Sequence, residues 1–489
     1  MSAAAEVLRQ LATLGVEPLN VTDDSRLVAP GDLFLAFPGS AADGRRYIAD
    51  AIARGAAAVV WESAGADGVD WATLTVPNIA VTNLRALAGN IAHAVLGEPS
   101  ERLSLIAVTG TNGKTSCSQW IARTYPRRCA IIGTLGAGFP EVLQDTGFTT
   151  PQATTLARCL TAFVADGAAA CALEASSIGI EEGRMNGARV DIAAFTNLTR
   201  DHLDYHGSMD AYAAAKEKLF VWPGLRAAVL NLDDEFGRHL AGVTTARLKV
   251  GYTLDKATAC VDLMLGASNI HHAADGLAFT LTAPQGAVDI SSRLVGRYNV
   301  ANLLAVAGVL LAAGLPFEQL ASRLSALDAP PGRMQRLGGV GQPLVFIDYA
   351  HSPDALDNAL AALREQAAAR SGRLVCVFGC GGDRDHGKRP QMGEVAARGA
   401  DRVVLTSDNP RSESPLAIIE EIRAGATGAE VVPDRKAAIA MAVAAARPED
   451  VVLIAGKGHE AYQEVAGAFH SFSDLREAEA ALAARKEAA

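Results

Sequence analysis

The sequence predicts an α/β protein of several domains, and three observations support that prediction. The chain has 489 residues, of which 49% are hydrophobic, so it can build roughly two to four domains with substantial cores. A buried strand, a glycine turn and a helix follow one another at Leu105–Ser116. From about residue 331 onward, strands alternate with helices, which is typical of a parallel sheet. We expect three units, at residues 1–98, 99–330 and 331–489.

Composition and charge argue against several classes of protein. The net charge is −10 and no basic block occurs, which disfavours nucleic-acid binding. No apolar run is long enough for a membrane span and no signal peptide is recognisable, so a cytoplasmic enzyme is expected. The seven cysteines are scattered and odd in number, which argues against a full disulfide framework. Cys376 and Cys380 lack a second pair, so core and loop cysteines are favoured over a metal site.

The first unit shows alternating elements but little chemistry. Asp32–Phe37 predicts a short strand, and Asp43–Glu62 predicts a helix and then a strand, with Gly55 at the helix C-cap. Ser25 and the Arg45-Arg46 pair are polar groups at element ends. Solvated surface is the favoured interpretation of these groups, and anion recognition is the alternative. Leu96–Arg102 predicts a linker to the second unit.

The glycine turn of the second unit has the features of a phosphate-binding loop. Glycines let backbone N–H groups approach phosphates, the lysine reaches the terminal phosphates, and the threonine hydroxyl can bind Mg²⁺. The residues concerned are Gly110, Thr111, Asn112, Gly113, Lys114, Thr115 and Ser116. The match is incomplete, because Val108 stands where the full pattern has a glycine. A turn that binds nothing is the alternative, but Lys-Thr at a helix start after a clear strand favours nucleotide binding.

Two further strand ends of this unit carry candidate magnesium ligands. Glu174 ends a strand within Ala170–Ile180, where a carboxylate beside a nucleotide loop is a natural Mg²⁺ ligand. An ordinary loop glutamate is the less favoured alternative. His202 and His206 have a spacing that resembles zinc ligands, but no third ligand supports zinc. A histidine that assists an oxygen-bound Mg²⁺ site is the preferred interpretation.

Lys216 falls on the apolar face of a predicted helix at Asp210–Trp222. Tyr212 and Phe220 lie on the same stripe, whereas Lys218 falls away from it. A lysine whose ammonium reaches solvent is normally the favoured interpretation. A buried lysine instead has a lowered pKa, and its neutral amine can react with CO₂ to give an anionic carbamate that could bind a metal. The residues alone leave both possibilities open.

The third unit carries polar groups at four strand ends. The first strand ends at Asp348, and the second at a glycine loop that bears Arg384. The third is followed by Asp408-Asn409-Pro410-Arg411, and the fourth by Gly456–Glu460. Because parallel strand ends meet at one edge of a sheet, these groups predict a ligand site there. Before this unit, Gly296–Leu315 predicts an apolar helix entered through Asn299, and Arg333 lies in a Pro/Gly-rich joint.

Taken together, these motifs resemble the Mur ligase family over essentially the whole chain. The motifs, in the family's order, are GTNGKT, LEASS, TNLTRDHLDYHG, YAAAK, GRYNVANLLA, DYAHSPDAL, GDRDHGKRP, DNPR and AGKGHE. The resemblance implies an α/β fold in three domains, with a central P-loop-type ATPase domain and a C-terminal Rossmann-like domain. It implies an ATP-dependent amide ligase that adds meso-2,6-diaminopimelate to UDP-N-acetylmuramoyl-L-alanyl-D-glutamate through an acyl phosphate, in peptidoglycan precursor synthesis. A monomer is expected.

The resemblance also implies roles for individual residues. For the UDP-muramoyl-dipeptide they are Ser25, Ser40, Ala41, Ala42, Thr149, Thr150, Ser176, Glu182 and Arg184. For ATP they are the phosphate loop together with Asn302, Arg333 and Asp348. Two Mg²⁺ ions are implied, one on Thr115 and Glu174, the other on His202 and a carbamylated Lys216. For the incoming amino acid they are Arg384, Asp408, Asn409, Pro410, Arg411, Gly456 and Glu460.

Three positions depart from the family's pattern, and rival functions remain. Ile178 replaces a common histidine, Glu182 stands where relatives often have glutamine, and Gln335 replaces a frequent glutamate. The rivals are a lysine-adding ligase, a folylpolyglutamate synthase and a nucleotide-binding regulator. In the family the DNPR form goes with diaminopimelate, whose distal carboxylate pairs with Arg411. A lysine acceptor is therefore expected to leave Arg411 unpaired.

Overall fold

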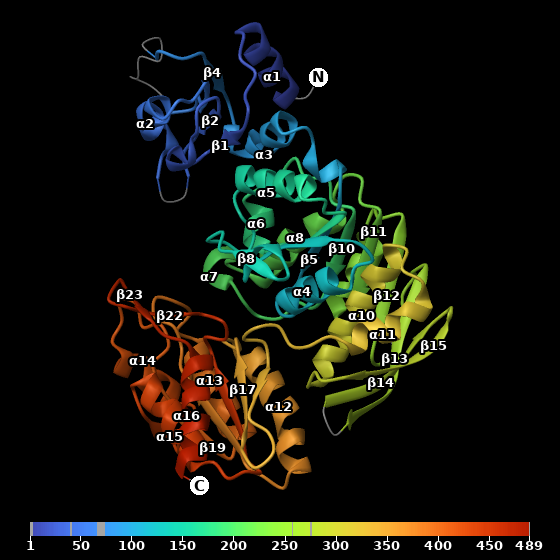
Figure 1. The fold of residues 1–489 in the computed structure, drawn as a ribbon, viewed down its shortest axis with the longest axis vertical. Helices are drawn as coiled ribbons and strands as arrows, with labels where there is room; N and C mark the ends of the chain where they lie inside the picture. The colour runs from blue at the N-terminus through green and yellow to red at the C-terminus, as the bar shows by residue number, and fades with distance from the viewer. Residues whose placement is uncertain (1–2, 40–41, 66–73, 257, 274–275, 489) are drawn as a thin grey trace.

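The computed structural model describes residues 3–39, 42–65, 74–256, 258–273 and 276–488. Those residues form four β-sheets, three of them covered by helices, so the predicted α/β class is confirmed. Figure 1 shows an elongated molecule whose N- and C-terminal ends lie at opposite poles, with the largest sheet between them. No helix within the described ranges is long and apolar enough to cross a membrane.

The first sheet is parallel and has the order β1-β2-β3-β4. Its strands are β1 (Val21–Thr22), β2 (Leu33–Ala36), β3 (Ala58–Glu62) and β4 (Asn78–Val81), accompanied by α1 (Ala3–Thr13), α2 (Ile48–Ala53) and α3 (Leu84–Val95). The strand, helix and strand predicted here are thus present, and Gly55 follows α2 with φ +99°. The segment predicted as a linker follows α3 and precedes β5 (Ser104–Thr109). It contains a 3₁₀ turn, Pro99–Glu101, whose buried Ser100 accepts a hydrogen bond from Arg189 N at 2.9 Å.

The central sheet has eleven strands, of which seven neighbours, β6-β9-β5-β10-β11-β12-β13, run parallel. Its strands are β5 (Ser104–Thr109), β6 (Cys129–Gly133), β7 (Gly136–Phe139), β8 (Val142–Gln144), β9 (Ala170–Glu174), β10 (Ile192–Phe195), β11 (Ala227–Asn231), β12 (Leu248–Thr253), β13 (Leu263–Ala273), β14 (Gly276–Ala283) and β15 (Gly286–Ser292). Its helices are α4 (Lys114–Thr124), α5 (Ala153–Ala165), α6 (Ser177–Glu181), α7 (Leu203–His206), α8 (Met209–Phe220), α9 (Glu235–Val243), α10 (Arg297–Ala312) and α11 (Leu320–Ser325).

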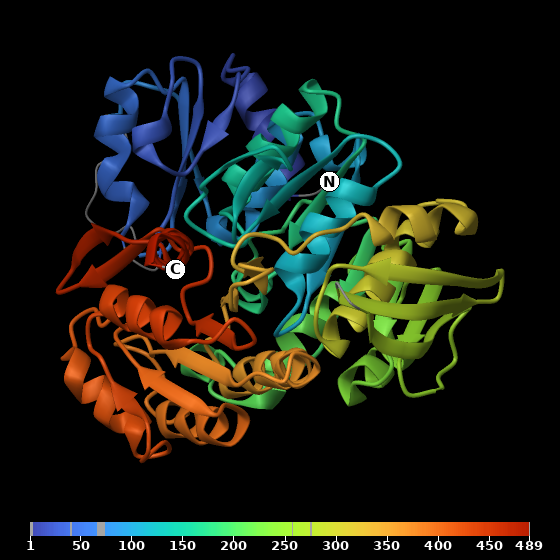
Figure 2. The same ribbon diagram turned by 60° about the horizontal axis from the view of Figure 1, so that its bottom comes forward.

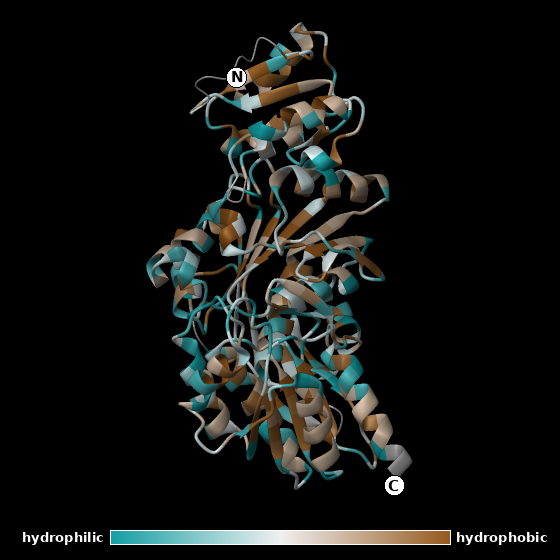
Figure 3. Ribbon diagram, turned by 90° about the vertical axis from the view of Figure 1, so that its left-hand side faces the viewer, coloured by the Kyte–Doolittle hydropathy of each residue, from teal (hydrophilic) through white to brown (hydrophobic). Residues whose placement is uncertain are grey.

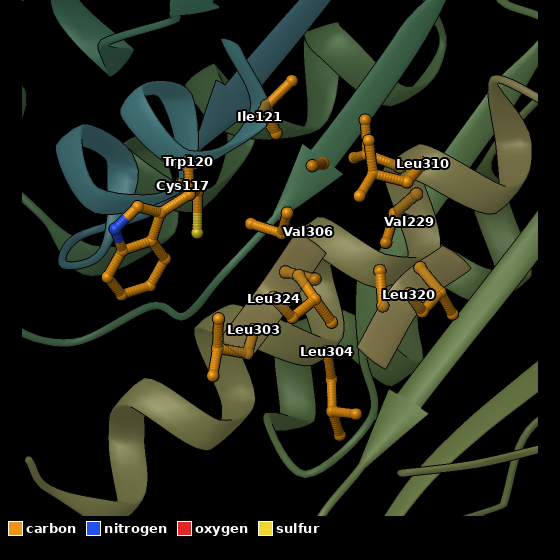
Figure 4. Packing of buried hydrophobic residues seen from close by; sticks show 14 of the residues in the cluster. Cys117, Trp120, Ile121, Val229, Leu303, Leu304, Val306, Leu310, Leu320 and Leu324 are labelled. Atoms are coloured by element: carbon orange, nitrogen blue, oxygen red, sulfur yellow. The ribbon is translucent and has the colours of Figure 1, made fainter. Parts of the chain in front are cut away.

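The apolar helix α10 lies in the core on one face of this sheet. Its Leu303, Val306 and Leu310 pack with Trp120 of α4 and Val229 of β11 (Figure 4). The helix begins at Arg297, so its predicted entry through Asn299 is wrong by two residues. Asn299 lies in the first turn, where its Nδ2 donates to Val295 O at 2.8 Å. This packing anchors α4, and therefore the phosphate loop that precedes it.

The third sheet has the order β16-β17-β21-β18-β19-β20 and is parallel apart from β16. Its strands are β16 (Gln335–Leu337), β17 (Leu344–Asp348), β18 (Leu374–Phe378), β19 (Arg402–Leu405), β20 (Glu430–Val431) and β21 (Val451–Ala455). Its helices are α12 (Pro353–Ala369), α13 (Lys388–Gly399), α14 (Pro415–Arg423), α15 (Arg435–Ala445) and α16 (Asp474–Ala488), and β22 (Tyr462–Val465) pairs with β23 (Ala468–Ser471) as a separate hairpin.

Helices cover both faces of this third sheet. One face packs on α12, α13 and α14, and the other on α15 and α16. Figure 3 shows hydrophobic strands at the centre of this unit with more hydrophilic segments around them. In Figure 2 the yellow-to-orange segment that leads into β16 carries the chain from the central unit to the C-terminal one, and the two units face each other.

Candidate active site

Two adjoining cavities lie between the central and C-terminal units. The larger, of about 800 Å³, is lined by the phosphate loop, Glu174, Lys216 and Arg333. The smaller, of about 430 Å³, lies over the strand ends of the C-terminal sheet. Residues of both units form a common wall, because both cavities are lined by Ile178, Asp201, His202, Tyr349, His351, Asp354 and Arg384. The geometry therefore places two compartments side by side.

The phosphate loop has the conformation that the sequence predicts. It joins the end of β5 to the start of α4, and Gly110 and Gly113 adopt φ +148° and +88°. A Cβ on Gly110 would lie 1.9 Å from Thr196 Oγ1, and one on Gly113 would lie 2.5 Å from an Asn302 oxygen. Only glycine fits at either position. The loop therefore presents bare backbone towards the larger cavity, as a phosphate cradle requires.

Lys114 folds back over this loop. Its Nζ donates hydrogen bonds to Gly110 O at 2.7 Å and to Thr111 O at 2.9 Å. Burial lowers the pKa of this ammonium, while the carboxylates of Glu174 and Asp201 oppose the shift. The cation is thus held at the loop, where it can exchange its carbonyl partners for phosphate oxygens.

The end of strand β10 holds the loop in place, a support that the sequence does not reveal. Asn197 Oδ1 accepts a hydrogen bond from Asn112 N at 2.9 Å, and Thr111 N donates to Asn197 O at 2.8 Å. Thr196 Oγ1 donates to Asn112 O at 2.5 Å. The Asn-Leu-Thr run after a strand is the available signal, but the pairing depends on β10 lying next to β5.

Glu174 and Thr115, the predicted ligands of one magnesium ion, are in direct contact. Thr115 Oγ1 donates to Glu174 Oε2 at 3.0 Å, and Glu174 is 1% exposed. Thr134, which the sequence analysis does not single out, donates to Glu174 through both its backbone N and its hydroxyl at 3.0 Å. Carboxylate and hydroxyl oxygens are the hard ligands that Mg²⁺ prefers, so the donor set fits this ion.

Lys216 points inward, as the helical stripe predicts. It is 1% exposed, and its Nζ lies 4.2 Å from the centre of the Tyr212 ring. Burial, and to a smaller extent the charge of Lys114, lowers the pKa of Lys216 well below the usual value. The Lys216 Nζ makes no hydrogen bond to the part of the chain that the structure describes. Lys218, by contrast, reaches outward and pairs with Glu181 at 2.7 Å. The surroundings of Lys216 thus favour a neutral amine.

His202 and His206 differ in what they contact, although burial, and to a smaller extent the charge of Lys216, lowers the pKa of both. His202 has φ +52°, its Nε2 lies 3.5 Å from Asp201 Oδ2, and it faces the charge of Lys216. Burial lowers the pKa of His202, although Asp201 opposes the shift. His206 Nε2 contacts Ser177 Oγ at 3.0 Å instead. Within the described ranges no three His, Cys, Asp or Glu side chains converge on a metal position.

The residues proposed for the dipeptide divide into two groups. Thr149, Ser176 and Arg184 line the larger cavity, and Thr150 supports them by donating to Glu174 O at 2.7 Å. Arg184 also donates to Thr150 O at 2.9 Å.

The second group does not reach the cavities. Ser25 is buried in a 3₁₀ turn of the first unit, and Ala42 O accepts a hydrogen bond from Gly39 N. Neither lines either cavity. The predictions for Ser40 and Ala41 lie outside the described residues.

Glu182 is engaged with arginines. Its Oε2 accepts hydrogen bonds from Arg184 Nε and NH2 at 2.8 and 2.6 Å, and Arg85 of the first unit lies 3.5 Å away. Arg184 also lies over the Phe148 ring at 4.5 Å. The carboxylate that replaces the family's frequent glutamine therefore restrains Arg184.

Two of the residues predicted to bind ATP, Arg333 and Asp348, lie at the joint between the central and C-terminal units. Arg333 NH2 donates to Thr115 Oγ1 at 3.1 Å, and its guanidinium lies 4.5 Å over the Tyr349 ring. Asp348 accepts hydrogen bonds from Met334 N at 2.7 Å and Ala350 N at 2.8 Å. Burial raises the pKa of Asp348 to about 6, although Arg333 opposes the shift. Asp348 thus fixes the backbone beside Arg333. Asn302 also lines the cavity, with its side-chain oxygen next to Gly113.

The four strand ends of the C-terminal sheet converge as predicted, because β17, β21, β18 and β19 are parallel neighbours. The predicted residues that line the smaller cavity are Arg384, Asp408, Asn409, Arg411, Gly456 and Glu460. Pro410 lies between two of them in the chain but does not line the cavity. Asn409 Nδ2 donates to Glu460 Oε2 at 2.8 Å, so the third and fourth strand ends are joined directly.

Arg411 already has a carboxylate partner, which the sequence does not predict. It adopts φ +51°, its Nε donates to Glu464 Oε2 at 3.1 Å, and its NH1 donates to Gly382 O at 2.7 Å. The expectation that a lysine acceptor leaves Arg411 unpaired is therefore wrong. Glu464 belongs to the hairpin β22–β23, and only the fold brings it to Arg411.

Comparisons with known proteins agree with this geometry. Family profiles match at residues 20–95 (Mur ligase family, catalytic domain), 108–310 (Mur ligase middle domain) and 332–458 (Mur ligase, glutamate ligase domain). The chain is 51% identical over 473 residues to the UDP-N-acetylmuramoyl-L-alanyl-D-glutamate--2,6-diaminopimelate ligase of Pseudomonas aeruginosa, with 95% of each chain covered. It is 50% identical over 482 residues to the ligase of that name from Chromobacterium violaceum, which covers 97% of this chain and 96% of the relative.

A solved structure supports the same conclusion. A UDP-N-acetylmuramoyl-L-alanyl-D-glutamate--2,6-diaminopimelate ligase superposes with a TM-score of 0.68 at 37% identity, covering 96% of this chain and 95% of its own. Similarity of this extent runs through all three units of the chain. The protein belongs to the Mur ligase family.

Proposed function

We propose that this chain is an ATP-dependent ligase that adds meso-2,6-diaminopimelate to UDP-N-acetylmuramoyl-L-alanyl-D-glutamate in peptidoglycan precursor synthesis, and that it acts as a monomer with domain boundaries near residues 98 and 330. The observation that carries the proposal is the common wall between the two cavities. Because the same residues line both cavities, an acyl phosphate formed beside Lys114 and an amine bound near Asp408 can react without leaving the protein. The names of the relatives reported above support the choice of substrates.

The reaction begins with phosphoryl transfer in the larger cavity. An oxygen of the D-glutamate γ-carboxylate forms a bond to the γ-phosphorus of ATP as the bond to ADP breaks. Lys114 and the loop N–H groups stabilise the phosphate charge, since such transfer depends mainly on positioning and electrostatics. Arg333 and Asn302 hold the nucleotide from the joint and from α10. Thr149, Thr150, Ser176 and Arg184 position the dipeptide, and Ser25 and the Ser40–Ala42 loop hold the distant UDP end.

The amide forms at the common wall. The amine of the incoming amino acid attacks the acyl carbon, the carbon–oxygen bond to phosphate breaks, and amide, inorganic phosphate and one proton result. Arg411 and Arg384 bind carboxylates of the amino acid, while Asp408 and Glu460 attract its ammonium groups. Apposition of the two units keeps water from the acyl phosphate.

Magnesium fits the oxygen donors described above. Thr115 and Glu174 would hold one ion, and His202 with a carbamate on Lys216 would hold a second. When bound there, such ions would supply charge neutralisation for the transferred phosphoryl group. The Lys216 amine is buried and makes no hydrogen bond to the residues that the structure describes, which supports carbamate formation because a neutral amine is the form that reacts with CO₂.

One assay tests the proposal. ADP release is measured with the UDP-muramoyl-dipeptide and a panel of amino acids that includes meso-diaminopimelate, L-lysine and L-glutamate. We expect turnover that requires both the dipeptide and meso-diaminopimelate. ADP release with L-lysine or L-glutamate but not with meso-diaminopimelate would indicate a sister ligase. ATP binding without ADP release would indicate a regulator.

A further inference from the structure

Lys457 is a fully buried cation directly behind the smaller cavity. It follows strand β21, has 0% of its surface exposed, and does not line the cavity itself. Its Nζ donates to Asn409 Oδ1 and to Glu460 Oε2, both at 2.9 Å, and lies 4.0 Å from Asp408 Oδ1. All three partners line the cavity. One ammonium thus contacts three of the groups that face the incoming amino acid.

The contacts of Lys457 fix the orientation of the Asn409 amide. Asn409 Oδ1 accepts hydrogen bonds from Lys457 Nζ and from Glu464 N at 3.0 Å, and Asn409 Nδ2 donates to Glu460 Oε2. A rotated amide would turn its NH₂ group towards two donors and its oxygen towards a carboxylate. Both contacts would be repulsive, so the amide has one satisfied orientation. In that orientation Glu460 Oε2 receives two donors, which restrains this carboxylate as well.

Charge balance gives the second argument. Asp408 and Glu460 place two carboxylates at one end of the cavity, and like charges in a secluded site repel. Lys457 contacts both, while the buried Arg435 lies 3.9 Å from the second oxygen of Asp408 and is held by Asp474 at 2.7 Å. An ordinary structural ion pair could also explain a buried lysine. A purely structural ion pair, however, gives no reason why both side-chain partners of Lys457, Asn409 and Glu460, line the cavity.

We infer that Lys457 is a positioning residue that holds Asn409 and Glu460 in the geometry that binds the incoming amino acid. This inference rests on the proposed function, because it assigns the smaller cavity to that substrate. Loss of the ammonium frees the amide to rotate and removes the cation that contacts the two carboxylates, so that Arg435, 3.9 Å from Asp408, is left to balance them. Affinity for the amino acid should fall, while the distant phosphate loop keeps its geometry.

The test compares two variants, Lys457→Met and Lys457→Gln, with the control Lys436→Met. Lys436 is an exposed lysine of the same sheet unit that pairs with Glu477 at 3.3 Å. For both Lys457 variants we expect KM for meso-diaminopimelate to rise on the order of 10-fold, with KM for ATP and ADP binding unchanged. The control should match the wild type in all three quantities.

A double variant distinguishes positioning from general stabilisation. If Lys457 acts through Asn409 and Glu460, then Asn409→Ala with Lys457→Met should raise KM by less than the product of the two single effects, because both changes disturb the same contacts. Multiplicative effects, an unchanged KM, a loss confined to kcat, or failure of both Lys457 variants to fold would each overturn the inference. The wild type is assayed first with the amino-acid panel. If it uses another amino acid, the proposed acceptor is wrong, and the Lys457 comparison is made with the amino acid that is used.

Discussion

Replacing Arg411 by alanine is expected to lower kcat/KM for meso-diaminopimelate by roughly 10- to 150-fold. A hydrogen bond between charged groups contributes about 1.5–3 kcal/mol, which converts to that range. The Arg411 side chain is 23% exposed and already donates to Glu464 and Gly382, which leaves part of its guanidinium for a substrate carboxylate. The loss should therefore fall towards the lower end of the range.

The same contact limits how strongly L-lysine is rejected. L-lysine has no distal carboxylate to pair with Arg411. Because Glu464 still pairs with Arg411 when L-lysine is bound, binding does not carry the full free-energy penalty of an unpaired buried cation. We expect the wild type to prefer meso-diaminopimelate by a similar 10- to 150-fold in kcat/KM. Glu464→Gln should remove this compensation and reduce turnover of L-lysine further.

The assay is ADP release at subsaturating amino acid, with ADP affinity measured separately by calorimetry. Arg423→Ala, an exposed arginine of α14 that pairs with Glu420, serves as the control. The reasoning fails if Arg411→Ala weakens ADP binding as much as it lowers kcat/KM, or if the wild type uses L-lysine as efficiently as meso-diaminopimelate.

Three further predictions concern the larger cavity and the joint. Lys114→Ala should reduce turnover by at least about 10³-fold, on the order of 4 kcal/mol, while the melting temperature stays near that of the wild type; near-normal ADP release would mean that the loop is misinterpreted. Lys216→Ala should lose most activity and regain part of it with formate, whereas Lys218→Ala should be nearly silent; equal losses, or an unmodified Lys216 in the mass spectrum of active enzyme, would contradict the carbamate. Because burial raises the pKa of Asp348 to about 6, its folded form binds a proton more readily than its unfolded form. The stability of the wild type relative to Asp348→Asn should therefore rise by about 1.4 kcal/mol between pH 7.5 and pH 5, measured by denaturant unfolding; a difference that falls with decreasing pH would show the opposite shift.

Local patterns were sufficient to predict much of the fold and part of the site. The strand, glycine turn and helix around Lys114 are local, and Lys216 lies on a helical stripe whose period is visible in the sequence. The four strand ends could be grouped because parallel strands share one edge. The first residue of α10 was missed by two positions, because Asn299 donates to Val295 O from within the first turn and does not cap the helix.

Contacts between distant segments could not be predicted in this way. Glu464 reaches Arg411 through a hairpin 53 residues further along, and Thr134 reaches Glu174 from 40 residues away. Neither pairing leaves a repeat or a motif in the sequence. The positioning contacts of Lys457 were likewise hidden, because a lysine after a strand has no local signal of burial.

The contact between the phosphate loop and α12 makes occupancy of the two cavities reciprocal. Asn112 Nδ2 donates to Asp354 Oδ2 at 3.1 Å, and Thr199 Oγ1 donates to the same oxygen at 3.3 Å. This carboxylate oxygen can accept from both only while the two units are apposed. A ligand that favours apposition of the two units raises the affinity for the nucleotide by some factor. The nucleotide must then raise the affinity for that ligand by the same factor. The contacts of Asp354 therefore couple the two affinities through the interface, and weakening these contacts should reduce that coupling.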